Sequence, residues 1–295
     1  MMDNEAGGPW YHDDFQRFRD SLTFTEAQTG FSARLIEKDY FCTLVLADLS
    51  RRFERALVFK GGTCLSKVHA EFFRLSEDLD FCVATPPEAT RSDRRQAATT
   101  IKERFTEVPR RLTWFEVADP FTGYNNSRQY NGRLAYPSAV TGEREFINVE
   151  VSFREEIILP SELLPARTLL RDPQSAQAPL PPVDVYVLQR PEAYAEKIRA
   201  ALTRPEPAIR DFFDIDHALQ SALLDHRDPK MRALVAKKLS VAADDPVDLS
   251  ESKLANLQAQ LATQLRPVLR AADYKAFDLE RAFAALQEMM ASSQS

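Results

Sequence analysis

The spacing of hydrophobic and polar positions changes near the middle of the chain. In the first part, short apolar runs alternate with amphipathic stretches, a pattern that predicts strands interleaved with helices. Five prolines follow between residues 172 and 191, and proline disfavours helix at and before its own position. Beyond them, nearly every segment has apolar residues at helical spacing. We therefore expect an α/β domain over residues 1–171, a Pro-rich linker over 172–191 and an α-helical domain over 192–295.

The same pattern places the individual elements. In the α/β part it predicts helices over 28–53, 63–73 and 91–108, and strands over 56–59, 79–84, 112–117 and 144–153. In the second part it predicts helices over 191–202, 208–224, 230–238, 250–264 and 279–290.

Composition and charge narrow the class of protein. The 295 residues are 44% hydrophobic and 28% charged, which is typical of a globular protein. No apolar run approaches the roughly 18–20 residues of a membrane span, and the three cysteines lie in apolar segments without metal-ligand spacing. We expect a cytoplasmic protein with no membrane partner. The net charge of −6 disfavours a large nucleic-acid surface but leaves room for a local one. The basic residues between Arg91 and Arg111 could form such a patch or an ordinary solvated helix face.

A glycine-rich turn joins the strand at 56–59 to the helix that follows it. The sequence there is Lys60-Gly61-Gly62-Thr63. Glycines let backbone N–H groups approach an anion closely, and the start of a helix presents its partial positive charge at the same point. The turn is a candidate phosphate-binding site, although most Gly-Gly turns are only tight turns.

Two carboxylates follow within the next strand. Asp78 and Asp80 are two residues apart, so they lie on one face of a strand while Leu79 and Phe81 lie on the other. Two neighbouring carboxylates repel each other unless a cation is bound, and Mg²⁺ prefers one or two carboxylates together with substrate phosphates. The alternative is that Asp78 caps a turn and Asp80 pairs with Arg74.

A third carboxylate comes from the strand predicted at 144–153. Its residues alternate strictly from Ile147, so Asn148, Glu150 and Ser152 share a polar face. If this strand lies beside that of Asp80, Glu150 reaches the same cleft. Three carboxylates on neighbouring strands could hold two metal ions for a nucleotidyl displacement. The alternative is that Glu150 is an ordinary exposed strand residue.

The helical part adds cationic and acidic candidates. Lys197 lies at the edge of the apolar face of its helix, and Arg210 precedes Asp211 and Asp214, which share one face of the next helix. A lysine and an arginine that face a triphosphate would stabilise charge on the leaving group. The alternative is an interdomain salt-bridge set that joins Lys197 to Asp211 or Asp214.

Taken in order, these residues resemble a known family. The matching segments are 36–40 (Ile-Glu-Lys-Asp-Tyr), 59–63 (Phe-Lys-Gly-Gly-Thr), 74–80 (Arg-Leu-Ser-Glu-Asp-Leu-Asp), 195–200 (Ala-Glu-Lys-Ile-Arg-Ala) and 210–214 (Arg-Asp-Phe-Phe-Asp). They resemble the AbiEii-type nucleotidyltransferase toxins of type IV toxin–antitoxin and abortive-infection systems, within the DNA polymerase β-like nucleotidyltransferase superfamily. One departure is a threonine at position 63, where the superfamily usually has serine, and the hydroxyl is retained.

The resemblance implies a mixed-sheet nucleotidyltransferase domain followed by a helical domain that closes the nucleotide cleft. It implies that Asp78 and Asp80 bind Mg²⁺, and the strand pattern adds Glu150 as a third metal ligand. The catalytic set expected on this basis is Asp78, Asp80, Glu150, Lys197 and Asp211. The expected nucleotide-binding set is Lys60, Gly61, Gly62, Thr63, Arg74, Ser76, Lys197, Arg210 and Asp214.

The function implied is that of an Mg²⁺-dependent nucleotidyltransferase toxin. It would transfer NMP from an NTP to an RNA acceptor, with the 3′ end of tRNA as the expected site, and so inhibit translation and growth. A cognate antitoxin would restrain it. A second hypothesis keeps the chemistry but places the acceptor on a protein hydroxyl or a small molecule, which the acidic balance favours mildly. A third is a non-catalytic nucleotide-binding interaction module, which the presence of the carboxylates disfavours.

Overall fold

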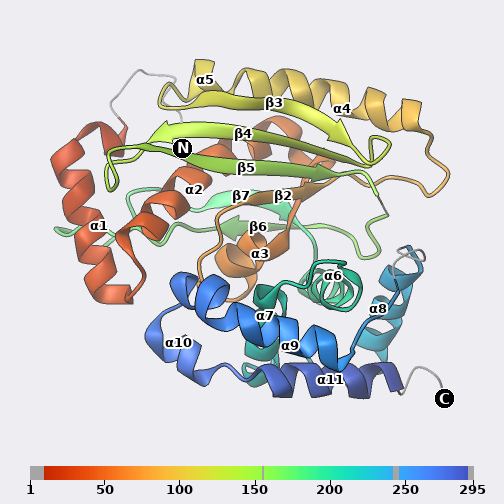
Figure 1. The fold of residues 1–295 in the computed structure, drawn as a ribbon. Helices are drawn as coiled ribbons and strands as arrows, with labels where there is room; N and C mark the ends of the chain where they lie inside the picture. The colour runs from red at the N-terminus through yellow and green to blue at the C-terminus, as the bar shows by residue number, and fades with distance from the viewer. Residues whose placement is uncertain (1–9, 155, 242–245, 292–295) are drawn as a thin grey trace. The chain divides into compact units, whose positions relative to one another are not determined.

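The protein has an α/β part followed by a helical part, as the sequence predicts (Figure 1). The computed structural model describes residues 10–154, 156–241 and 246–291. The chain divides into two compact units, Met1–Leu188 and Gln189–Ser295. The first unit contains a mixed sheet of seven strands, and the second contains helices α6 to α11.

The sheet of the first unit has the strand order β3-β4-β5-β2-β1-β7-β6. The pairs β2–β5 and β1–β7 are parallel, and the other pairs are antiparallel. The strands are β1 (Val58–Lys60), β2 (Leu79–Cys82), β3 (Glu116–Tyr124), β4 (Gln129–Pro137), β5 (Arg144–Ser152), β6 (Glu162–Ala166) and β7 (Val183–Val187).

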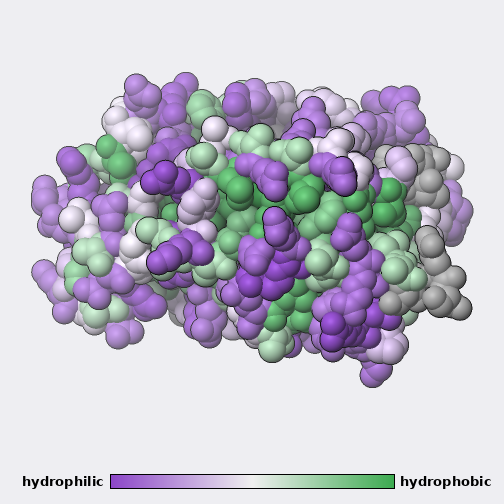
Figure 2. Space-filling view, turned by 60° about the horizontal axis from the view of Figure 1, so that its bottom comes forward, coloured by the Kyte–Doolittle hydropathy of each residue, from purple (hydrophilic) through white to green (hydrophobic). Residues whose placement is uncertain are grey.

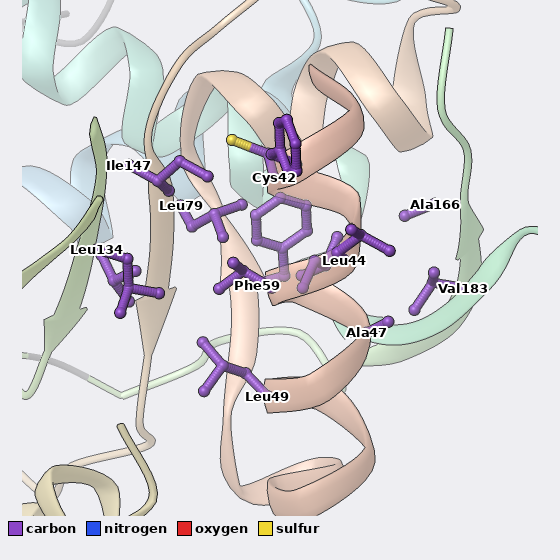
Figure 3. Packing of buried hydrophobic residues seen from close by; sticks show 14 of the residues in the cluster. Cys42, Leu44, Ala47, Leu49, Phe59, Leu79, Leu134, Ile147, Ala166 and Val183 are labelled. Atoms are coloured by element: carbon purple, nitrogen blue, oxygen red, sulfur yellow. The ribbon is translucent and has the colours of Figure 1, made fainter. Parts of the chain in front are cut away.

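Helices cover the apolar face of this sheet. They are α1 (Phe15–Thr29), α2 (Ala33–Phe53), α3 (Gly61–Cys64), which continues into a π-helical turn (Leu65–His69), α4 (Arg91–Thr106) and α5 (Val108–Arg111). Helix α2 packs Leu44 and Leu49 towards Phe59 of β1 and Leu79 of β2 (Figure 3). Helix α4 lies alongside β3 (Figure 1). Side chains alternate between the two faces of a strand. Because the helices bury one face, the polar side chains of the neighbouring strands β3, β4, β5 and β2 lie on the opposite face.

Three differences from the expected elements concern this unit. Helix 28–53 begins only at Ala33, because Gly30 takes a left-handed conformation (φ 77°) that ends α1. Strands β4 and β6 were not predicted, and β3 lies mostly beyond the strand expected at 112–117. The segment 172–191, expected to be a linker, contains β7, so the sheet continues almost to the end of the unit.

The second unit consists of helices packed around aromatic contacts. They are α6 (Arg190–Thr203), α7 (Ile209–Gln220), α8 (Pro229–Val241), α9 (Glu251–Gln260), which continues into a π-helical turn (Leu261–Leu265), α10 (Ala271–Ala276) and α11 (Leu279–Ala291). Phe212 of α7 stacks on Phe283 of α11 with ring centroids 5.9 Å apart.

The surface is largely hydrophilic on the face shown in Figure 2, with hydrophobic side chains between the polar ones. Within the described ranges, no helix is both long and apolar enough to cross a membrane. The large hydrophobic residues that are exposed there are Phe15, Tyr124, Val140, Leu163 and Val247.

Candidate functional site

The glycine turn lies directly against the acidic strand. Strand β1 ends at Lys60, and Gly61 then adopts φ 75°, a conformation that side chains disfavour. A Cβ on Gly61 would lie 2.2 Å from Oδ2 of Asp80. A Cβ on Gly62 would lie 2.5 Å from Nη2 of Arg74 and 3.1 Å from Oγ of Ser76. Gly61 is therefore required both by its backbone conformation and by its packing on Asp80, whereas Gly62 leaves room for the Arg74 and Ser76 side chains.

Hydroxyl groups fix the segment that leads into the carboxylates. The Thr63 hydroxyl donates to the backbone carbonyl of Asp78, and the Ser66 hydroxyl donates to the backbone carbonyl of Arg74. Thr63 is fully buried. The contact that the structure gives it thus holds the turn to the start of β2.

A row of polar residues crosses the sheet from this turn, and each residue pairs with the next on the neighbouring strand. Asp80 is the register partner of Lys60 on β1 and of Glu150 on β5. Glu150 is in turn paired with Asn131 on β4, which is paired with Thr122 on β3. Since register partners lie opposite each other and face the same side, these five residues form one row over five strands. The expected adjacency of the strands of Asp80 and Glu150 is confirmed.

Two amides orient the carboxylates. Asn148 Nδ2 donates to Asp78 Oδ1 at 2.8 Å, and Gln129 Nε2 donates to Glu150 Oε2 at 2.7 Å. Each amide bonds to one oxygen of its carboxylate, so these two hydrogen bonds do not occupy the second oxygen of either group.

A cleft of about 460 Å³ opens over this polar face. Asp78, Asp80, Asn148 and Glu150 line one side of it. Residues of β3 and β4 line the other side, among them Asp119, Thr122, Tyr124, Asn131 and Arg133. Its size is within the range of small-molecule sites, about 300–1,000 Å³.

The donor set suits a hard cation, with one restriction. Carboxylate oxygens are the ligands that Mg²⁺ prefers, and it takes few of them when phosphates and water complete its shell. No group of three or more His, Cys, Asp or Glu residues that could hold a metal ion is found in residues 10–154, 156–241 and 246–291. Asp78, Asp80 and Glu150 therefore do not form such a group by themselves.

A buried ion pair anchors the helix that follows the glycine turn. Lys67 Nζ lies 2.6 Å from Asp39 Oδ1 on α2 and donates to the hydroxyl of Thr43 at 2.7 Å. The other oxygen of Asp39 accepts hydrogen bonds from the Thr168 hydroxyl and the Leu169 N–H. Lys67 is 1% exposed and Asp39 2% exposed. The sequence pattern places Asp39 within a matching segment but gives no signal for Lys67, whose partner is distant in the chain.

The two residues before Asp39 on α2 also contact segments near the cleft. Glu37 accepts from the Ser138 hydroxyl and, at 2.7 Å, from the Ala139 N–H, and burial raises the pKa of its carboxyl group. Lys38 Nζ lies 2.7 Å from Oε2 of Glu77, one residue before Asp78. The Glu-Lys-Asp segment at 37–39 therefore joins α2 to the π-helical turn after α3, to the segment that precedes β2 and to the loop between β4 and β5.

In the helical unit, the predicted charges contact one another. Lys197 Nζ lies 2.8 Å from Asp211 Oδ1 and 3.0 Å from Asp214 Oδ2, and Asp214 is fully buried. Arg204 lies 3.4 Å from the second oxygen of Asp211, while Arg210 is exposed. The expected salt-bridge set exists, but it lies within the helical unit and not between domains. The roles of Lys197, Arg210, Asp211 and Asp214 towards a nucleotide stay predictions.

The sequence matches the family described as nucleotidyl transferase AbiEii toxin, type IV toxin–antitoxin system, over residues 44–289. This chain belongs to the AbiEii family. The family consists of nucleotidyltransferase toxins, so an NTP substrate and an antitoxin belong to its context. The matched range contains the glycine turn, the cleft carboxylates and the Lys197 helix of this AbiEii protein, whereas the Glu-Lys-Asp segment at 37–39 precedes it.

One solved structure shares the fold at low sequence identity. JHP933 from Helicobacter pylori is 14% identical, with a TM-score of 0.51, over 88% of this chain and 91% of that one. A proposed nucleotidyltransferase from the same organism is 15% identical, with a TM-score of 0.46, over 87% of this chain and 88% of that one. No curated protein matches the AbiEii chain.

Proposed function

We propose that this AbiEii toxin transfers NMP from an NTP to the 3′ end of an RNA, with tRNA as the expected acceptor, in an Mg²⁺-dependent reaction. It would act in the cytoplasm, block translation and be restrained by an antitoxin. The observation that carries the proposal is the register of Asp80 with Glu150, beside a glycine turn that packs on Asp80 itself.

The residues of the cleft suit the separate parts of such a reaction. The backbone N–H groups of the Gly61–Gly62 turn would bind the phosphates of the NTP. Asp78, Asp80 and Glu150 would hold Mg²⁺ only together with the phosphates of the NTP, and the ion would neutralise these phosphates and activate the attacking hydroxyl when bound.

Asn148 and Gln129 would keep two of these carboxylates oriented through the hydrogen bonds described above. The acceptor oxygen would bond to the α-phosphorus as the bond to pyrophosphate breaks. The hydroxyl proton would pass to a carboxylate oxygen of the cleft.

Incubation with each labelled NTP, with Mg²⁺, and with or without total RNA tests this proposal. We expect label in RNA only when RNA, Mg²⁺ and one preferred NTP are present. Asp80→Asn should abolish transfer, while Asp184→Asn on β7, an exposed strand carboxylate outside the cleft, should not.

Other outcomes would contradict the proposal in distinct ways. A folded Asp80→Asn protein that still labels RNA would exclude the catalytic assignment. Label on protein or on small molecules without RNA would favour the second hypothesis. NTP binding by calorimetry without any transfer would favour a non-catalytic module.

A further inference from the structure

The cleft has two chemically different sides. On one side lie Asp78 and the carboxylates of β2 and β5, of which Asp80 packs on the glycine turn, and this side suits phosphates and metal. On the other side the sheet face continues over β4 and β3, where the lining residues are an amide, a guanidinium, a hydroxyl and a phenol ring, from Asn131, Arg133, Thr122 and Tyr124. The proposed nucleotide chemistry uses the first side and leaves the second side unassigned.

Arg133 is held over an aromatic ring on this second side. Its guanidinium lies over the ring of Phe146, 4.4 Å from the centroid. Its Nε is 2.7 Å from Asp119 Oδ2, although this N–H makes no hydrogen bond within the described part of the chain. Arg133 is also the register partner of Asn148, which orients Asp78. A guanidinium fixed in this way presents a plane and N–H donors that suit a base or a phosphate.

Tyr124 forms the outer end of the same side. It is the last residue of edge strand β3, and its side chain is about half exposed, at 52%. Among the exposed large hydrophobic residues named above, Tyr124 is the one that lines the cleft. The residue before it, Gly123, lies so close to Tyr130 that a Cβ would approach its ring to 2.7 Å. An exposed aromatic ring on a sheet is a platform on which a nucleic-acid base can stack.

The charge of the cleft decides which part of an RNA fits. Asp78, Asp80, Asp119 and Glu150 all line it, against the single cation of Arg133. The phosphates of an RNA duplex need cationic partners, so this acidic face disfavours the double-stranded part of an RNA. Bases of an unpaired end, which bind by stacking and hydrogen bonds, suit it better.

We propose that the β3–β4 side of the cleft is the acceptor subsite and takes the unpaired 3′-terminal nucleotides of an RNA. Tyr124 stacks on a base, Arg133 and Asn131 contact the next nucleotide, and the 3′-hydroxyl reaches the carboxylates. This inference rests on the proposed function and adds the residues that bind the acceptor.

Binding and kinetics of an RNA hairpin with a short unpaired 3′ extension test the subsite. Tyr124→Ala should raise the Kd of the hairpin, measured by fluorescence anisotropy without NTP, and its KM in transfer by about tenfold or more. The KM of the NTP should stay unchanged, and Tyr124→Phe should restore RNA binding because the ring is kept. Arg133→Ala should also raise the KM of the RNA. Phe15→Ala on α1 is the matched control, since Phe15 is 50% exposed outside the cleft.

The outcomes separate this inference from the proposed function. If the wild-type protein labels RNA and Tyr124→Ala leaves the Kd and KM of the hairpin unchanged, the subsite is refuted and the function stands. Equal binding of a blunt-ended hairpin, or a raised KM for the NTP alone, also overturns it. If the wild-type protein neither binds nor labels RNA, both proposals are wrong.

Discussion

Replacement of Gly61 by alanine tests the link between the glycine turn and the carboxylates most directly. Gly61 has φ 75° and its Cβ would meet not only Oδ2 of Asp80 but also its Cβ and Cγ, at 2.8 and 2.9 Å. The clash therefore cannot be relieved by rotation of the carboxylate end alone. Gly142 offers a control in the hairpin between β4 and β5, with φ 73° and no atom within 4 Å of its Cβ position.

The expected magnitudes follow from these two environments. An alanine at positive φ costs roughly 1–2 kcal/mol, and this penalty is common to both variants. Overpacking against a fixed neighbour adds about 1–3 kcal/mol at Gly61 only. The free energy of unfolding should therefore fall by about 2–5 kcal/mol in Gly61→Ala and by about 1–2 kcal/mol in Gly142→Ala.

Transfer activity should separate the variants further. A displacement of about 1 Å near reacting groups can cost about 100-fold in rate, so Gly61→Ala should lose activity on that order while Gly142→Ala retains it.

Urea unfolding followed by tryptophan fluorescence measures the free energy of unfolding of the unit that contains Gly61 and Gly142. Both tryptophans, Trp10 and Trp114, belong to the unit that contains the sheet. Two variants of equal stability and full transfer activity would refute the argument that Gly61 is required by its contact with Asp80.

Three further predictions concern buried charges. Lys67→Met should lower the free energy of unfolding by about 3–5 kcal/mol in the same urea assay, because it leaves Asp39 buried without its cation. Combination with Asp39→Asn should recover part of the loss, and purely additive effects would contradict the pairing. Burial lowers the pKa of His12 from 6.5 to about 4, so the unfolded state takes up a proton first and stability should fall as the pH drops from about 6.5 to 4, by at most about 3 kcal/mol. His12→Phe should flatten this part of the pH profile, and an unchanged slope would exclude His12 as its source. Lys238→Met, which removes the cation beside two glutamates of α6, should lower the melting temperature by circular dichroism, whereas exposed Lys237→Met should not; equal shifts would contradict the role of the buried pair.

The local parts of the site could be predicted from sequence because strand alternation and turn chemistry are local properties. The glycine turn, the acidic strand and the polar face of β5 all lie where the pattern places them. The pairing of β2 with β5 was a hypothesis that depended on the fold, and the register of Asp80 with Glu150 confirms it. The family resemblance is confirmed by the match over residues 44–289.

The remaining parts depended on contacts between distant residues. Edge strand β3 contains Pro120 and Gly123 and is largely exposed, so it has no clear alternation of apolar residues. Strand β6 contains Pro165 and is also at an edge of the sheet. Asp39 finds its partners 28 to 130 residues away, which no local pattern reveals.

The sheet order also determines when during synthesis the cleft can exist. The carboxylates of Asp80 and Glu150 belong to strands whose pairing is parallel, and β7 must then add to the far side of β1. Such non-local pairings form slowly because a long loop closes before contacts compensate for it. A nascent chain that ends before β5 lacks one side of the cleft, and one that ends before β7 has an incomplete sheet. A ribosome that synthesises this chain must therefore make almost the whole first unit before the cleft can be complete.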